Sequence, residues 1–209
     1  AHCIVKIIAR LGKSRKKFSF NKIPLQDSVL FSTFGGATGT LKNRESYDME
    51  KKLQEIASHF ALEGGIAAID SLGEGFINDT FIIRTEGEAP DYILQRKNKN
   101  IFPDVPAMMD NIRRVTDHIR RGVIAAGGDP RREVMTVVPT REDALYHIDG
   151  DGEYWAVSVF IDDTVAYNKA DSPELARKGG EGIGKFQAQL ADFTEPLAET
   201  IKGFHNIRH

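Results

Sequence analysis

The sequence predicts an α+β domain built on a mostly antiparallel sheet. Segments rich in β-branched and aromatic residues cluster along the chain instead of alternating with helices, which disfavours a parallel α/β fold. A first helix precedes these segments, one clear amphipathic helix separates the first three of them from the next three, and further helices follow. The 209 residues, 41% of them apolar, suffice for one large domain or two small ones.

Composition excludes several classes of protein. A net charge of −2 and a pI of about 6.3 offer no global attraction to nucleic acid, so any anion site must be local. The single cysteine, Cys3, excludes an internal disulfide framework and a cysteine-based zinc site. No apolar run approaches the roughly 18 residues of a membrane span, and the start lacks the pattern of a signal peptide. We expect a cytoplasmic protein acting on a small molecule, with no nucleic-acid or membrane partner; the oligomeric state stays open.

Composition also divides the chain into three parts. Residues 1–46 are basic and then loop-like, and we expect a poorly ordered extension; an anion-binding arm is the less favoured alternative. Residues 47–166 carry the predicted sheet. Residues 167–209 begin a helical region.

The first ordered helix is expected over DMEKKLQEIASHFALEGG, residues 48–65, where Gly64 and Gly65 supply the stop. Its apolar face comprises Met49, Leu53, Ile56 and Phe60. Strands are expected over IAAIDSL (66–72), TFIIRTE (80–86) and YILQRKN (92–98), with GEGFIND as the first turn.

Asp104 as N-cap and Pro106 in the first turn predict the start of the next helix, which Gly122 ends. Further strands are expected over EVMTVVPT (133–140), DALYHID (143–149) and EYWAVSVFI (153–161). Ser172 and Pro173 open a later helix, and residues 197–209 form a short helix or loop. The apolar side of that later helix is Leu175, Ile183, Phe186 and Leu190, and we expect it to lack packing partners.

Two Gly-Lys segments resemble a phosphate-binding P-loop, and we reject the P-loop interpretation for both. Gly12–Ser14 lacks the required glycine five residues earlier. Gly179–Lys185 has the correct spacing, but Phe186 replaces the magnesium-binding Ser or Thr, and the segment lies inside a predicted helix. We expect these glycines to allow close approach of the helix backbone to a neighbouring element.

The stronger phosphate-binding candidate is SLGEGFINDTF, residues 71–81. Its two glycines, Gly73 and Gly75, lie between two strands, and a Gly-rich hairpin can fold its backbone N–H groups over a triphosphate. A G-x-G turn alone is weak evidence, because most such turns only reverse the chain. Three short polar residues follow it and can bond phosphate, ribose or sugar hydroxyls: Asn78, Asp79 and Thr80.

The third strand adds a cation. Kinases place a basic group of this strand against the nucleotide phosphates and hold it with an acid on the next helix, which here carries Asp110. Gln95 and Arg96 face opposite sides of the strand, and the register decides which of them faces the nucleotide. The alternative for Arg96 is a solvated strand residue beside Lys97 and Lys99.

These motifs resemble the kinase family related to aminoglycoside phosphotransferases, with the N-acetylhexosamine 1-kinases as the nearest branch. The resemblance extends from about Tyr47 to the end of the chain. It rests on GFINDTFII, DYILQRKNKNIFPDVPAMMDNIRRVTDHI, EYWAVSVFIDDT, GKFQAQLADF and LAETIKGFHNIR. It implies a protein-kinase-like N-lobe over residues 47–166 and the truncated start of a helical C-lobe over 167–209.

The resemblance also implies a site for ATP and Mg²⁺, with a hinge at residues 160–164 that meets the adenine. The implied nucleotide-binding residues are Gly73, Gly75, Asn78, Thr80, Gln95, Arg96 and Asp110. Asp79 and His205 are implied near the acceptor. In this family an H-G-D-x-x-x-x-N loop carries the catalytic Asp and a Mg²⁺ ligand, and no such loop occurs before His209. We therefore expect neither the base nor the metal ligands in this chain.

Three functions fit these residues. The favoured one is an ATP-dependent kinase for a small-molecule hydroxyl, most simply the anomeric hydroxyl of a sugar, with this chain alone inactive. The second is a kinase of the same fold with an aminoglycoside, choline or homoserine as acceptor. The third is a non-catalytic nucleotide-binding or interaction module.

Overall fold

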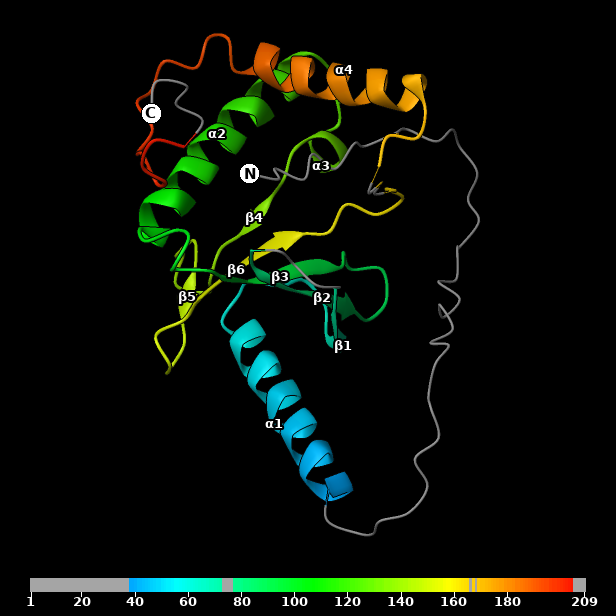
Figure 1. Cartoon of the computed structure of the whole chain (residues 1–209), viewed down its shortest axis with the longest axis vertical. Helices are drawn as coiled ribbons and strands as arrows, with labels where there is room; N and C mark the ends of the chain where they lie inside the picture. The colour runs from blue at the N-terminus through cyan, green and yellow to red at the C-terminus, as the bar shows by residue number, and fades with distance from the viewer. Residues whose placement is uncertain (1–37, 73–76, 166, 168, 205–209) are drawn as a thin grey trace.

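A computed structural model describes residues 38–72, 77–165, 167 and 169–204, with side chains described from residue 47 onward. Figure 1 shows the arrangement. The helices are α1 (Thr38–Ser58), α2 (Val105–Ala125), α3 (Pro130–Glu133) and α4 (Pro173–Gln189). The strands are β1 (Ile66–Ser71), β2 (Asp79–Thr85), β3 (Tyr92–Lys97), β4 (Val137–Val138), β5 (His147–Ile148) and β6 (Tyr154–Val159).

The described strands form one antiparallel sheet in the order β1-β2-β3-β6-β4, and β5 also pairs with β6. This confirms the predicted α+β class. Helix α2 connects β3 to the second half of the sheet, as the sequence predicts. Helices α1 and α2 lie on opposite sides of the sheet (Figure 1).

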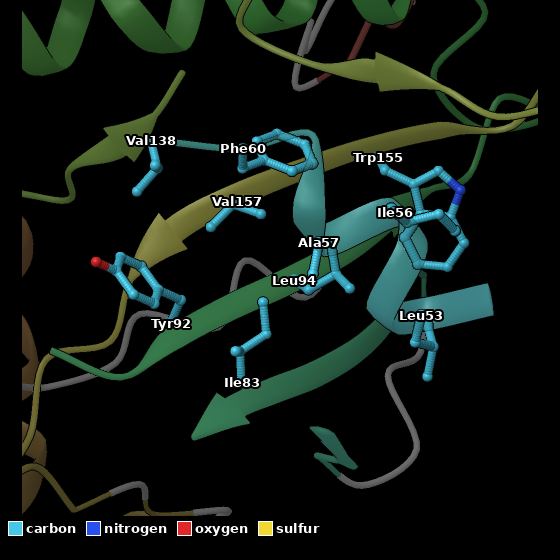
Figure 2. Close-up of a cluster of buried hydrophobic side chains, with 10 residues drawn as sticks. All are labelled: Leu53, Ile56, Ala57, Phe60, Ile83, Tyr92, Leu94, Val138, Trp155 and Val157. Atoms are coloured by element: carbon cyan, nitrogen blue, oxygen red, sulfur yellow. The ribbon is translucent and has the colours of Figure 1, made fainter. Parts of the chain in front are cut away.

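The larger core lies between α1 and the sheet (Figure 2). Three of the four apolar residues predicted for α1 are buried there, and the fourth, Met49, is exposed because it lies a turn beyond the sheet-covered part of the helix. The cluster comprises Leu53, Ile56, Ala57, Phe60, Ile83, Tyr92, Leu94, Val138, Trp155 and Val157. Its members on β2, β3 and β6 alternate with residues that face α2.

The smaller core lies between α2 and the sheet. Val105, Met108 and Met109 pack against Ala156 of β6. Asp104 caps this helix as predicted, because its Oδ1 accepts a hydrogen bond from the Ala107 N–H at 2.9 Å. The helix continues past Gly122 to Ala125, where Ala126, Gly127 and Gly128 bond back to its last turn.

The structure corrects three element predictions. Helix α1 begins at Thr38, inside the segment 1–46 that we expected to be a loop-like extension. The helix can extend in this direction because each added residue gains one backbone hydrogen bond once a stable helical segment exists. Strand β4 has only two residues, because Asp129 caps α3 immediately before it. Strand β5 is equally short, because Thr140 and Ala144 close a tight turn with bonds of 2.8 and 3.0 Å.

Helix α4 starts after the Ser172 cap, as predicted, but contains no buried residue. Ile183 and Phe186 are 47% and 49% exposed, as expected for an apolar face without a partner. The expectation is wrong for Leu190, which packs against the buried Ile119, Val123 and Val134. The expected close approach of the glycine backbone to a neighbour is wrong within the described residues: apart from the adjacent residues and the nearby backbone of α4 itself, no described atom lies within 4 Å of a Cβ built on Gly180, Gly182 or Gly184. Within the described ranges, no helix has the length and apolar character needed to cross a bilayer.

Candidate functional site

The two sides of β3 differ in chemistry. Tyr92 and Leu94 point toward α1 and belong to the larger core, so Arg96 points to that side as well. Gln95 and Lys97 point to the side covered by α2, opposite Ala156 and Tyr154 of β6. Of the two residues proposed for the phosphate contact, Gln95 is therefore the one on the α2 side.

Arg96 is engaged in an exposed ion pair on the α1 side. Its register partner on β2 is Asp79, whose carboxylate accepts from both Nε, at 2.7 Å, and a terminal guanidinium nitrogen. The two side chains are 45% and 50% exposed. Arg96 is thus a largely solvated strand residue, as in the alternative interpretation, and the structure adds its surface pair with Asp79.

A row of polar side chains lies on the α2 side and leads from the β1–β2 turn toward the end of β3. The Lys97 Nζ donates to Gln95 Oε1 at 2.7 Å, and Gln95 Nε2 donates to Thr80 Oγ1 at 3.1 Å. The Thr80 hydroxyl donates to the Asn78 carbonyl at 3.3 Å. The Asn78 side chain ties the turn to the end of β3 by accepting from the Asn98 N–H at 3.0 Å. We call Asn78, Thr80, Gln95 and Lys97 the polar row.

Lys97 is the residue of this row that the sequence analysis missed. Lys97 was named from the sequence only as a neighbour of Arg96 and was given no role, but it is only 8% exposed. Burial lowers the pKa of its ammonium to about 8. Among the described residues no carboxylate forms an ion pair with it, and its one hydrogen bond leaves two N–H donors for an anion. Strand alternation places Lys97 on the same side as Gln95, but only the pairing with β6 shows that this side faces α2.

Asp110 does not hold the third-strand cation. It follows the buried Met109 on α2, which turns its side chain away from the sheet. Its carboxylate accepts from Arg113 at 2.7 Å and lies 3.8 Å from Arg114, both on the same helix. The expected pairing of Asp110 with Arg96 is therefore wrong, and Lys97 has no described acid in its place.

The other predicted residues flank this region or lie outside the described chain. Gly73, Gly75 and His205 are outside the described residues. The hairpin around the Gly-rich turn is closed by the Leu72 N–H, which donates to the Thr80 carbonyl at 2.8 Å. In the expected hinge, Phe160 bonds to Asp91 at 2.8 Å, and Asp163 adopts a left-handed backbone conformation with φ of 49°.

A large cavity among the described residues lies elsewhere. It has a volume of about 810 Å³ and lies between the C-terminal half of α2, the following turn, and α4. Its charged lining includes His118, Arg121, Glu133 and Lys185, and it contains no residue of the polar row. Within the described residues no group of three His, Cys, Asp or Glu side chains could hold a metal ion.

No protein-family model matches the chain. Its structure is similar to the crystal structure of a spectinomycin phosphotransferase in complex with ADP and spectinomycin, with a TM-score of 0.48 and 15% sequence identity. The similarity covers 70% of this chain and 38% of that chain. A likeness at this level does not assign an activity to the chain.

Proposed function

We propose that this chain is the nucleotide-binding part of an ATP-dependent phosphotransferase that acts on a small-molecule hydroxyl. The observation that carries the proposal is Lys97, a buried ammonium without a described acid, at the end of a polar row that starts beside the Gly-rich turn. Burying an ammonium is costly unless an opposite charge compensates it. A bound phosphate supplies that charge.

The polar row fits a nucleotide phosphate in chemistry and in place. Lys97 supplies an ammonium with free donors, and Gln95 fixes its direction through the 2.7 Å bond. The strand order also agrees with a kinase nucleotide site, in which a Gly-rich turn, a third-strand cation and the following helix surround the phosphates. Here the cation is assigned to Lys97 and not to Arg96.

We assign the nucleotide, but not the magnesium ion, to residues of this chain. The described residues provide no cluster of ligands that would hold Mg²⁺ on its own. In this proposal Mg²⁺ arrives with the ATP phosphates and lowers their charge, and its protein ligands and the catalytic base are not assigned to this chain. Phosphoryl transfer depends on those groups acting together, so we expect this chain to bind nucleotide without turning it over.

The acceptor is proposed from the sequence motifs alone. The resemblance favours a sugar with an anomeric hydroxyl, such as an N-acetylhexosamine. The second candidate is another alcohol, with an aminoglycoside, choline or homoserine as the test compounds. A panel of these acceptors with a longer form of the protein that contains a catalytic loop decides between them, because only the true acceptor accelerates ADP release.

Titration calorimetry with Mg-ATP tests the nucleotide proposal, using Lys97→Met and the matched control Arg96→Met. A charged hydrogen bond contributes about 1.5–3 kcal/mol, so Lys97→Met should weaken binding by about 10- to 100-fold. Arg96→Met should change the dissociation constant by less than about threefold, because its partner Asp79 is on the other side of the sheet.

Two results would overturn the proposal. Equal losses of affinity in the two variants would show that the side of the strand does not matter. Absence of nucleotide binding by a folded wild-type chain would favour the third function, a plain interaction module. Circular dichroism of both variants provides the folding control, and Lys97→Met should fold normally because it exchanges a buried charge for an apolar side chain of similar length.

A further inference from the structure

The segment that follows α4 runs along α2 and contacts it over several turns (Figure 1). Residues 192–198 are separated from their α2 partners by more than 70 positions in sequence. We call residues 192–198 the strap. Its contacts with α2 are polar and specific, and they come from three helix residues: Asn111, Arg114 and His118.

Each of the three side chains binds a different part of the strap. The Asn111 amide pairs with the backbone of Ala198, donating to its carbonyl at 2.8 Å and accepting from its N–H at 3.0 Å. Arg114 donates to the Glu195 carboxylate and to the Pro196 carbonyl, both at 2.8 Å. The Arg114 side chain is only 22% exposed, so solvent screens this pair less than an open surface pair.

His118 completes the series at the start of the strap. Its Nε2 lies 3.0 Å from Asp192 Oδ1, and its ring meets the Phe193 ring edge-on at a centroid distance of 5.2 Å. The spacings of three and four residues between the three side chains place them on one face of α2. That face adjoins the stripe of Val105, Met108 and Ile112 that packs on the sheet, so α2 is held on two sides.

The strap contacts matter for the site because α2 covers the side of the sheet that carries the polar row. Met108 and Met109 pack on Ala156, the register neighbour of Gln95, and Tyr154, the register neighbour of Lys97, borders the same cluster. Four buried residues form this cluster, and the C-terminal part of α2 packs separately, through Ile119 and Val123, against Val134 and Leu190. The N-terminal part of α2, which covers the row, therefore has few buried contacts with the sheet.

We propose that the strap fixes the position of α2 over the polar row, and that Asn111, Arg114 and His118 are positioning residues for the nucleotide. Only the effect on nucleotide affinity rests on the proposed function, and the effect of the strap on the position of α2 does not. Releasing the strap should allow α2 to move away from the sheet and hydrate the row, so that an anion there is held less tightly.

The experiment compares Arg114→Ala and Asn111→Leu with the matched control Arg113→Ala in the full 209-residue chain. Arg113 lies on the same helix and forms ion pairs with Asp110 and Asp117, while Glu195 of the strap acts on it only through a longer-range charge interaction, so its removal leaves the strap hydrogen bonds intact. Native-state hydrogen exchange of the α2 amides, Mg-ATP calorimetry and NMR titration of the Lys97 amine are measured for each variant.

We expect α2 exchange to rise by about tenfold in Arg114→Ala and Asn111→Leu, and Mg-ATP affinity to fall by about three- to tenfold. The titration of Lys97 should move upward toward that of an exposed lysine. Arg113→Ala should resemble wild type in all three measurements. Glu195→Gln, which removes the other partner of Arg114, should reproduce the effects of Arg114→Ala.

Two outcomes would overturn the inference. Unchanged exchange in both strap variants would show that the strap does not hold α2. Faster exchange with unchanged ATP affinity and an unchanged Lys97 titration would reduce the strap to a stabilising contact. If wild type itself does not bind ATP, the proposed function fails, and exchange together with the Lys97 titration still decides whether the strap positions α2 over the row.

Discussion

The two sides of the sheet use the same strands for different purposes. On the α1 side, β2, β3 and β6 contribute large apolar residues to a ten-residue core, and the charged pair Arg96–Asp79 lies at its exposed margin. On the α2 side the apolar cluster has four buried residues, and the adjoining surface of β2 and β3 is the polar row. The α1 side therefore contributes most of the buried apolar contacts, and the α2 side carries the Lys97 N–H donors that have no described partner.

From this difference we expect folding and the proposed nucleotide binding to depend on different residues, even on adjacent ones. Neighbouring residues of β3 belong to opposite sides, so substitutions one position apart should affect different properties. Four predictions test this separation, beginning with the largest expected effect.

Phe60→Ala should be the most damaging of these changes, because Phe60 is fully buried in the α1-side core. Truncating a buried phenylalanine costs about 3–5 kcal/mol of unfolding free energy, from the lost burial of the ring and from the cavity left behind. The matched change on the α2 side, Met108→Ala, should cost about 2 kcal/mol, because that cluster is smaller. Urea unfolding of both variants measures the difference, and equal losses would contradict the comparison.

Lys97 should make stability depend on alkaline pH. Burial lowers the pKa of its ammonium from 10.5 to about 8, so between these values the unfolded chain binds more protons than the folded chain. The free energy of unfolding should therefore rise as pH increases from 8 to 10.5, by at most about 3 kcal/mol. Urea unfolding across this range should show the rise in wild type but not in Lys97→Met. Parallel profiles would contradict the burial of this ammonium.

Asp149 should make the α1 side sensitive to acid. Burial raises the pKa of this carboxyl, but hydrogen bonds from the Glu153 N–H, the Trp155 indole, Lys52 and the Asp151 N–H outweigh it and bring the pKa to about 2. A lowered pKa stabilises the fold above about pH 4, and this contribution is lost as pH falls toward 2.

The matched pair Asp149→Asn and Asp151→Asn measures that contribution. Asp149→Asn should lower the free energy of unfolding by about 1–2 kcal/mol at neutral pH. It should also reduce the loss of stability that the wild type shows as pH falls from about 4 to about 2. Asp151→Asn should retain the wild-type acid limb, because the Asp151 side chain is 73% exposed. Identical acid unfolding of the two variants would remove Asp149 from this role.

The Arg96–Asp79 pair should have the smallest effect. Both side chains are about half exposed, and pairs of this kind contribute about 0–1 kcal/mol. A double-mutant cycle with Arg96→Met and Asp79→Asn should give a coupling energy below about 1 kcal/mol that falls further in 0.5 M salt. A larger coupling, or one insensitive to salt, would mean that this margin of the α1 side is more than a surface contact.

Periodicity predicted most of the fold. The apolar spacing of Leu53, Ile56 and Phe60 identified the face of α1, and the β-branched segments identified β1, β2, β3 and β6. The prediction failed where a local hydrogen bond competes with a ladder, as at Thr140, whose hydroxyl closes a turn that spans the end of one expected strand and the start of the next. It also failed at the start of α1, where Thr38 precedes the apolar pattern that was used to locate the helix.

The candidate site was only half predictable. Asn78, Thr80 and Gln95 were identified as polar residues near a turn, and the structure brings them together. The side of β3 that faces α2 could not be known, because it depends on pairing with β6 and on packing far away in sequence. Lys97 was missed for that reason. Asp110 was predicted to pair with Arg96, but its position on α2 turns its side chain away from the sheet.

The only tryptophan of the chain, Trp155, is buried on the α1 side with its indole N–H bonded to Asp149 at 3.0 Å. Its fluorescence is therefore an intrinsic optical probe of one side of the sheet. Emission should report unfolding of the α1-side core and remain insensitive to an anion bound at Lys97, whose side chain points the other way. Tryptophan emission should therefore distinguish unfolding of the α1-side core from binding of an anion at Lys97, without any added dye.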